Sequence, residues 1–265
     1  LAGCAGDKKD GAGKGAAGEA GPPAYGDAIV YGSIGDISGF LTAVTSDSAS
    51  HDAAGYVFNG LVRYDKNLRL EGELAESWEI SPDGKKITFH LRKGVAWHDN
   101  VQFTSEDVMF TYRKMIDPKT PTPYGESFKQ VRRVTNPGPH TVVVEYDKPY
   151  APALESWGMN ILPRHLLEKY PDIKQSPLNK SHPVGTGPFR FVEWKPGEKI
   201  VFDANPDYFE GKPYISRVVT RVIPDQATMF LELKSGGIDT MTLTPLQYSK
   251  QTETEEFRKN FRKYR

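Results

Sequence analysis

The sequence has 265 residues with 34 basic (Lys and Arg) and 34 acidic (Asp and Glu) side chains, so its formal net charge is zero. Such a chain has no overall field that would attract nucleic acid or an anionic membrane. Its single cysteine excludes an intramolecular disulfide and a cysteine-rich zinc site. No run approaches the roughly 18 to 20 apolar residues that a membrane-spanning helix needs.

The first segment differs from the rest of the chain. Residues 1–24 consist mainly of Gly, Ala, Lys, Asp and Glu without apolar periodicity, a composition that does not fold alone. The opening LAGC resembles the lipobox of bacterial lipoproteins, in which the signal peptide is cut before the cysteine and the thiol is lipidated. We therefore predict that residues 1–26 are a lipobox remnant and flexible tether within a longer precursor, with Cys4 as the lipidation site; a chance cysteine is the alternative.

The segments after residue 26 alternate between strand and helix patterns. AIVYGS predicts a short buried strand, and the small polar residues of TSDSAS precede an apolar helical face. In SWEISPDGKKITFHLR, two alternating segments flank a Pro-Asp-Gly turn, which predicts a hairpin with Trp78 and Phe89 facing the core. FTSEDVMFTYRKMIDP predicts a helix with Thr104 as its N-cap and Asp107 three residues further on.

The second half of the chain continues this alternation, which predicts the mixed α/β class. The expected elements are a strand in HTVVVEYD, a hairpin in FRFVEWKPGEKIVFDAN, a strand in SRVVTRVIP, a helix in DQATMFLELKSGG and a strand in IDTMTL. Gly236 and Gly237 are expected to end the helix.

No motif in the sequence indicates catalysis, a metal site or a cofactor. The six histidines lack close metal-ligand spacing, GAGKG lacks the spacing of a phosphate-binding loop, and no GxSxG elbow is present. PVGTGPF predicts a rigid corner rather than a phosphate cradle, and FRKNFRKYR predicts a solvated helix face rather than a nucleic-acid patch. We therefore expect no enzyme, no metal, no cofactor and no nucleic-acid partner.

Five stretches in order carry a resemblance to one family. They are FNGLVRYD, LAESWEISPDGKKITFHLRKGVAWHDN, FTSEDVMFTYRKMIDP, PVGTGPFRFVEWKPGEKIVFDANPDYF and VIPDQATMFLELKSGGIDTM. Together they resemble the family 5 extracellular solute-binding proteins, the receptors of bacterial ABC importers for oligopeptides, dipeptides and nickel. The family usually has Gly where Asn100 stands, and Asn is the residue next most tolerant of left-handed turn geometry.

The resemblance implies a periplasmic-binding-protein-like type II fold with two lobes that close on a ligand. Residues 27–58 and 164–265 would form lobe one, and residues 59–163 would form a subdomain inserted into it. We expect the second lobe to be absent from this chain, which would stop near the hinge.

The resemblance also implies the ligand contacts. Ser46, Asp47, Ser48 and Ala49 would lie near the ligand, where small side chains let a peptide backbone approach for strand addition. An ordinary polar loop, with a Ser or Asp that caps the following helix, is the alternative. Tyr124 matches a family position where an aromatic ring touches bound peptide, and a surface tyrosine in a Pro-rich loop is the alternative.

The function implied is that of a monomeric substrate-binding lipoprotein outside the cytoplasm, held at a membrane through Cys4. It would capture di- or oligopeptides and deliver them to ABC permease subunits. A nickel or metal-chelate receptor of the same family, or a peptide-sensing or chaperone-like lipoprotein without a transport role, are the alternatives.

Overall fold

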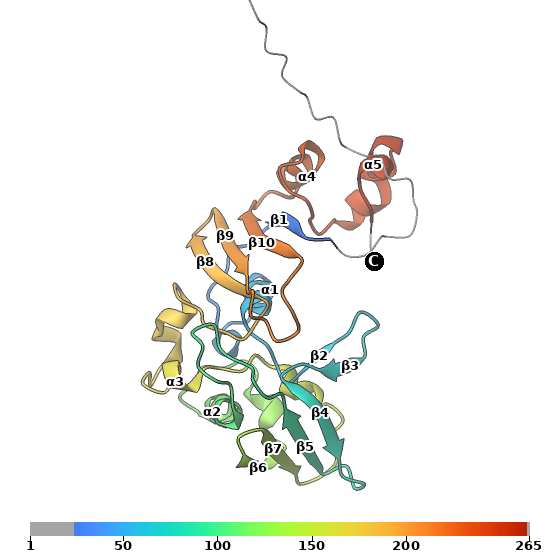
Figure 1. The fold of residues 1–265 in the computed structure, drawn as a ribbon. Helices are drawn as coiled ribbons and strands as arrows, with labels where there is room; N and C mark the ends of the chain where they lie inside the picture. Colours follow the sequence, from blue (N-terminus) through green and yellow to red (C-terminus); the bar gives the residue numbers. More distant parts are fainter. Residues whose placement is uncertain (1–23, 264–265) are drawn as a thin grey trace, which may run out of the picture.

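The computed structural model of the protein describes residues 24–263, so the predicted lipidation site Cys4 lies outside the described residues. A mixed four-stranded sheet carries both early and late parts of the chain (Figure 1). Its strands, in spatial order, are β1 (Gly26–Ser33), β10 (Ile215–Val222), β9 (Lys199–Ala204) and β8 (Phe189–Lys195). β1 pairs with β10 in parallel, and the other two pairs are antiparallel.

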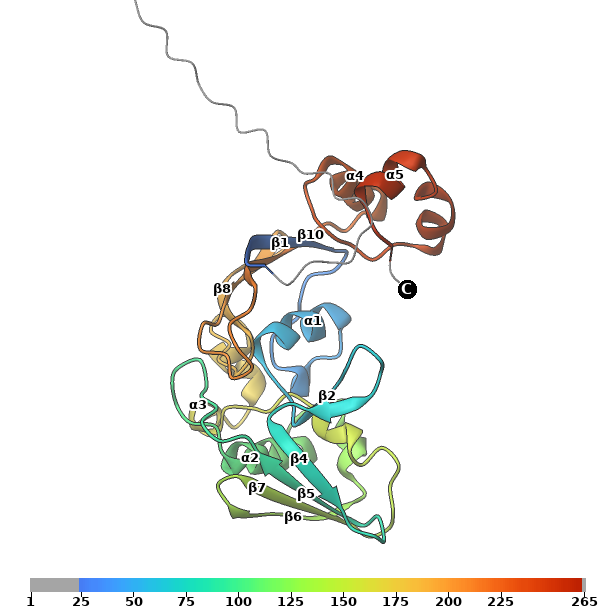
Figure 2. The same ribbon diagram turned by 45° about the vertical axis from the view of Figure 1, so that its right-hand side comes forward.

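A second four-stranded sheet, entirely antiparallel, is built from the middle of the chain. Its strands, in spatial order, are β4 (Ala75–Ile80), β5 (Lys86–Leu91), β7 (Thr141–Tyr146) and β6 (Val131–Gly138). The short hairpin of β2 (Val62–Tyr64) and β3 (Leu70–Gly72) projects to one side of the molecule between the two sheets (Figures 1 and 2).

The helices cover these sheets and line the space between them. The α-helices are α1 (Ser48–Val57), α2 (Ser105–Ile116), α3 (Arg164–Leu167), α4 (Gln226–Ser235) and α5 (Glu255–Asn260). The 3-10 turns are η1 (Thr42–Val44), η2 (Gly125–Phe128), η3 (Glu155–Gly158), η4 (Ile173–Gln175) and η5 (Pro177–Asn179), and η6 (Gln247–Gln251) is a π-helix. α1 packs on β8 of the first sheet, and α2 packs on β6 and β7 of the second. Within residues 24–263, no helix combines the length and apolar character needed to cross a bilayer.

The start of α2 has the predicted capping box. Thr104 accepts a hydrogen bond from the backbone of the first turn, and the Asp107 side chain accepts one from the backbone N–H of Thr104 at 3.0 Å. These bonds satisfy donors that the first helical turn leaves unpaired. The predicted turn at Asn100 is also confirmed, because its φ is +68°.

The predicted hairpin forms β4 and β5, with Trp78 directly opposite Phe89. Phe89 is fully buried, and its ring centroid lies 5.8 Å from that of Trp157. Trp78 is only half-buried, because β4 is the edge strand of its sheet. A single hydrophobic core nevertheless extends from this hairpin to the first sheet.

Two expectations about local structure need correction. β1 is half-buried or exposed along its length rather than buried, because it is an edge strand. Residues 238–243 do not form a strand: only Thr240 bridges to β1, and the Asp239 carboxylate accepts the N–H of Val30 at 2.7 Å, a donor that a paired strand would use. The charged residues of α5 are exposed, as expected of a solvated helix face, while Phe257 on the same helix is buried near Phe230.

Candidate functional site

A cavity of about 490 Å³ lies between the segment that leads into α1 and the turns that follow α2. One wall belongs to the part of the chain that joins the first sheet, and the other belongs to the part that surrounds the second. The lining residues are Thr42, Ala43, His51, Met115, Tyr124, Ser127, Phe128, Pro152, Glu155, Ser156, Gly158, Met159 and Asn160. A cavity of this size at the junction of two substructures is a typical place for a small-molecule or peptide site.

The predicted ligand segment 46–49 includes the N-cap and the first two residues of α1, and none of its residues lines this cavity. Ser46 and Ser48 are exposed, and Ala49 is half-buried against the core. Asp47 is the N-cap of α1, accepting the backbone N–H of Ser50 at 2.8 Å. The capping role that was the alternative is therefore present, and contact of these four residues with a ligand stays a prediction.

The Asp47 carboxylate is held in its ionised form. Partial burial acts to raise its pKa, but hydrogen bonds from Ser38 and Ser50 outweigh burial and hold the pKa of Asp47 below its usual range. A carboxylate at a helix N-terminus also interacts favourably with the helix dipole. These contacts fix the start of α1 and with it the direction of the side chains in its first turn.

Tyr124 does line the cavity, and it meets a residue from the opposite wall. Its hydroxyl lies 2.8 Å from Nε2 of His51, and the two rings are 5.7 Å apart at an interplanar angle of 75°. The same Nε2 lies 3.3 Å from the carbonyl oxygen of Thr45. The sequence analysis found no metal-ligand spacing for any histidine and did not single out His51. Its position just after the predicted ligand segment was the signal that could have placed it in the site.

The remaining lining is apolar at its base and acidic on one side. Met115 and Phe128 are buried there, and Met159 is half-buried. Methionine adapts its shape to varied apolar partners, which suits a site that accepts different side chains. Glu155 is the one Asp or Glu among the lining residues, and no Lys or Arg of the described chain lines the cavity. Its hydrogen bond with the phenol of Tyr64 raises the pKa of Tyr64.

The predicted corner PVGTGPF joins the two substructures at the end of α1. Gly187 donates its N–H to the carbonyl of Val57 at 2.8 Å, and a Cβ on Gly185 would lie 1.7 Å from that carbonyl oxygen. His98 bonds to both glycines: Nε2 lies 3.0 Å from the Gly187 oxygen, and Nδ1 lies 3.4 Å from the Gly185 nitrogen. The glycines are thus needed for close backbone packing, as expected of a rigid corner.

Asn59 forms the centre of a buried polar junction beside this corner. Its amide nitrogen donates to Glu73 at 2.7 Å, and its amide oxygen accepts from the hydroxyl of Thr186 at 2.8 Å. Glu73 also accepts the backbone N–H of Gly60 at 2.7 Å. Burial raises the pKa of Glu73, against the opposing effect of these hydrogen bonds.

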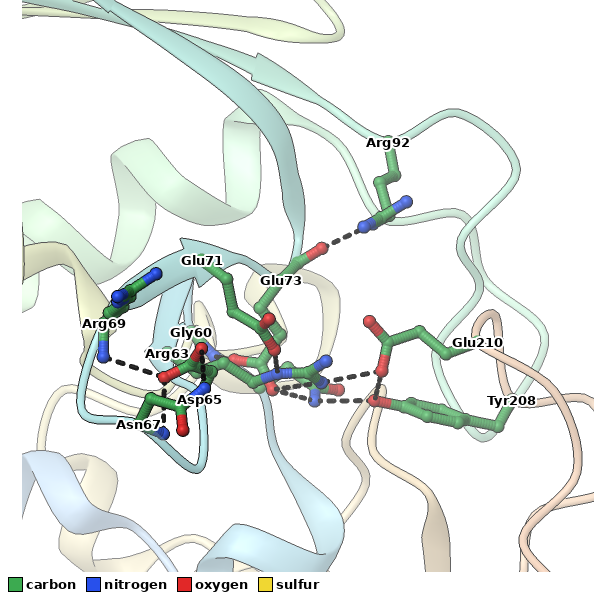
Figure 3. A network of polar contacts seen from close by, with 11 residues as sticks. Gly60, Arg63, Asp65, Asn67, Arg69, Glu71, Glu73, Arg92, Tyr208 and Glu210 are labelled. Atoms are coloured by element: carbon green, nitrogen blue, oxygen red, sulfur yellow. Dashed lines mark hydrogen bonds and ion pairs between the residues drawn. The ribbon is translucent and has the colours of Figure 1, made fainter. Parts of the chain in front are cut away.

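Arg63 extends the junction to the loop after β9 (Figure 3). Its guanidinium lies 2.8 Å from Glu71, 3.8 Å from Glu73 and 2.6 Å from Glu210. Figure 3 shows Tyr208 and Glu210 approaching Arg63 from the opposite side to the hairpin that carries Glu71 and Glu73. The network therefore ties the β2–β3 hairpin to the loop between β9 and β10 of the first sheet.

Within residues 24–263, no group of three or more His, Cys, Asp or Glu side chains is placed to hold a metal ion. The chemistry that the cavity offers is therefore apolar contact, hydrogen bonding and one carboxylate.

The sequence and the fold resemble those of known proteins. A family model described as bacterial extracellular solute-binding proteins, family 5 (middle), matches residues 69–264. The oligopeptide-binding protein AppA of Bacillus subtilis is 33% identical over 254 residues, which make up 94% of this chain and 46% of that protein. The structure of AppA in complex with a nonapeptide matches with a TM-score of 0.82 at 30% identity, over 88% of this chain and 47% of that chain.

Two further structures show the range of ligands among such proteins. DppA from Helicobacter pylori in complex with the peptide STSA matches with a TM-score of 0.79 at 33% identity, over 87% of this chain and 49% of that one. NikZ from Campylobacter jejuni in complex with Ni(L-His) matches with a TM-score of 0.78 at 32% identity, over 86% and 45% of the two chains. This chain spans less than half the length of each of these three proteins.

Proposed function

Since the chain belongs to the family 5 bacterial extracellular solute-binding proteins, we propose that it is part of a receptor that captures di- and oligopeptides and delivers them to the permeases of an ABC importer. The mixed α/β, type II periplasmic-binding-protein fold predicted from the sequence is confirmed by the likeness to AppA and DppA. The members of this family are binding receptors rather than enzymes. The observation that carries the proposal for this chain is the cavity between its two substructures, with Tyr124 on one wall and His51 on the other.

In this proposal, residues 27–58 and 164–265 act as lobe one and residues 59–163 as its inserted subdomain. The cavity would hold a side chain of the peptide, while the segment 46–49 would bond to the peptide backbone by strand addition. The apolar base formed by Met115 and Phe128 supports this, because it excludes water from a bound side chain. A second lobe, as in the relatives of twice this length, would close over the ligand and supply contacts to its charged ends.

A metal-chelate receptor is the second candidate, and the likeness to NikZ favours it. The cavity places one imidazole, one carboxylate and one phenol around its rim, and these groups could contact a chelate without being its main ligands. A peptide-sensing or chaperone-like lipoprotein without a transport role would use the same binding site, and it is the third candidate.

Calorimetric titration separates the first two candidates. The protein expressed from its complete reading frame would be titrated with a mixed tetrapeptide pool and, separately, with a nickel–histidine chelate. We expect peptides to bind with a Kd of about 1 to 10 μM, which corresponds to about −8 to −7 kcal/mol, and the chelate to give no heat of binding. Binding of the chelate with no heat of binding from peptides would contradict the peptide receptor and favour the metal-chelate receptor. Transport of bound peptide into vesicles that hold the importer, in an ATP-dependent manner, would separate transport from sensing.

We also propose that the receptor is a monomer held outside the cytoplasm by a lipid on Cys4. The sequence LAGC supports this. Cys4→Ser in the complete precursor should move the protein from the membrane fraction to the soluble fraction or leave the signal peptide uncut. Equal membrane recovery of both forms would contradict lipidation at this residue.

A further inference from the structure

The contact between His51 and Tyr124 bridges the two walls of the cavity across 73 positions of sequence. Two hydrogen-bond partners compete for Nε2 of His51, the Tyr124 hydroxyl at 2.8 Å and the Thr45 carbonyl at 3.3 Å. The position of one hydrogen atom therefore decides which kind of group Tyr124 presents to a ligand.

Either group can be the donor in the 2.8 Å contact, because a phenol oxygen and a ring nitrogen can each donate or accept. With its hydrogen on Nε2, His51 would donate to the Tyr124 oxygen or to the Thr45 carbonyl and would leave the Tyr124 hydroxyl hydrogen for a ligand. With the hydrogen on Nδ1 instead, Tyr124 donates to a bare Nε2, and its oxygen can act toward a ligand only as an acceptor. The specificity proposed below takes this second arrangement, which the NMR measurement below tests.

Two other lining groups are acceptors as well. Glu155 carries a carboxylate, and Ser156 has already donated its hydroxyl hydrogen to the carbonyl of Pro152 at 2.9 Å. Thr42, Ser127 and Asn160 can act in either sense. No Lys or Arg among the described residues lines the cavity to receive an anion.

We propose that the cavity selects a cationic, hydrogen-bond-donating group of the ligand, an amine or a guanidinium, and rejects a carboxylate. The apolar base of Met115, Phe128 and Met159 holds the methylene stem, and Glu155 and the Tyr124 oxygen receive the charged end. His51 is a positioning residue, because it acts on the ligand through the hydroxyl of Tyr124. This specificity rests on the proposed function as a peptide receptor.

The ligand test uses tetrapeptides that are identical except for one position, which holds lysine, norleucine or glutamate and is moved along the peptide. Norleucine matches the lysine stem without the charge, so the comparison isolates the cationic end. At the position that enters the cavity, we expect lysine to bind about five- to tenfold more tightly than norleucine and glutamate to bind least. Glu155→Gln should reduce the lysine preference to about twofold or less, and the matched surface variant Glu76→Gln should retain it.

The role of His51 has its own test. His51→Phe removes the acceptor, so the Tyr124 hydroxyl becomes free to donate and glutamate peptides should gain affinity relative to lysine peptides. His51→Gln, whose amide oxygen can accept the same bond, should restore the original order. In the ligand-free protein, ¹⁵N NMR should show an unprotonated Nε2 on His51, and Tyr124→Phe should shift that resonance.

The outcomes separate this inference from the proposed function. If no peptide binds, the receptor function and the specificity that rests on it both fall. If peptides bind with the same lysine-to-glutamate ratio in the wild type and Glu155→Gln, the receptor stands and the specificity is wrong. A protonated Nε2 on His51 in the free protein would overturn the assignment of Tyr124 as an acceptor.

Discussion

The histidine at the corner between the two substructures makes the stability of this protein depend on pH in a defined window. Burial lowers the pKa of His98 from 6.5 to about 4. Its neutral ring donates from Nε2 to the Gly187 carbonyl and faces the Gly185 N–H with Nδ1. Protonation would place a second N–H against that amide, in a site that water does not reach freely.

The sign and size of the effect follow from these values. As the pH falls below 6.5, the unfolded chain takes up the proton, while the folded protein does not do so until about pH 4. Stability is therefore fully present above pH 6.5 and is lost as the pH falls to about 4. A pKa difference of about 2.5 corresponds to a loss of about 3 kcal/mol, since one pKa unit is about 1.4 kcal/mol.

Urea unfolding followed by tryptophan fluorescence at several pH values between 7.5 and 4 measures this loss. Burial raises the pKa of Glu73 and Asp107, so these carboxyls contribute in the opposite sense at the acid end of the window. The difference between the wild type and His98→Gln cancels their contribution. At pH 7.5 the variant should be about 1 kcal/mol less stable, because the glutamine amide retains only the bond to Gly187.

As the pH falls, the difference should reverse, and the variant should be the more stable protein below about pH 5. His182→Gln, a change at an exposed histidine, is the matched control and should keep the pH dependence of the wild type. Parallel stability curves for the wild type and His98→Gln would refute the reasoning, because they would mean that His98 titrates alike in the folded and unfolded states.

Three further substitutions test the fold. Phe89 is fully buried in the core. Phe89→Ala should therefore lower the free energy of unfolding by about 3 to 5 kcal/mol without a specific loss of ligand affinity. Unchanged stability with lost binding would contradict the placement of Phe89 in the core. Leu68 has a φ of +59°, so its backbone is in the strained left-handed region. Leu68→Gly should relieve this strain and raise the free energy of unfolding by about 0.5 to 1 kcal/mol in chemical denaturation. A destabilised variant would show that Leu68 makes a needed contact. Gly185→Ala should lower the free energy of unfolding by about 3 kcal/mol or more, measured by thermal unfolding, because the new Cβ would clash with the Val57 carbonyl. A near-neutral effect would mean that the two segments of the corner can move apart.

Local chemistry explains why much of the fold could be predicted from the sequence. The capping box at Thr104, the positive φ of Asn100 and the left-handed cap at Gly236 depend on residues within a few positions of one another. Such features are specified by side-chain chemistry that does not need the rest of the chain. The strand expected at 238–243 was wrong because the backbone pairing with β1 does not extend beyond Asp239 and Thr240, and the Asp239 side chain accepts the N–H of Val30.

The candidate site was harder to predict because its contacts join distant segments. The sequence indicated Tyr124 through its resemblance but gave no reason to pair it with His51, which lies on another wall. Asp47 fits both a ligand contact and a helix cap in sequence terms, and the structure shows the cap. The buried junction around Glu73 had no signal in the sequence, because its partners Asn59 and Arg63 look like ordinary polar residues.

The central claim, that peptide binds against the cavity between the two substructures, is tested most directly by hydrogen–deuterium exchange of the complete protein with and without a saturating tetrapeptide. We expect slower exchange in the segments around residues 42–51, 124–128 and 155–160, which carry the two cavity walls. We expect unchanged exchange in the β5–β7 pair, none of whose residues lines the cavity. Protection confined to other segments, with these three unchanged, would contradict the claim.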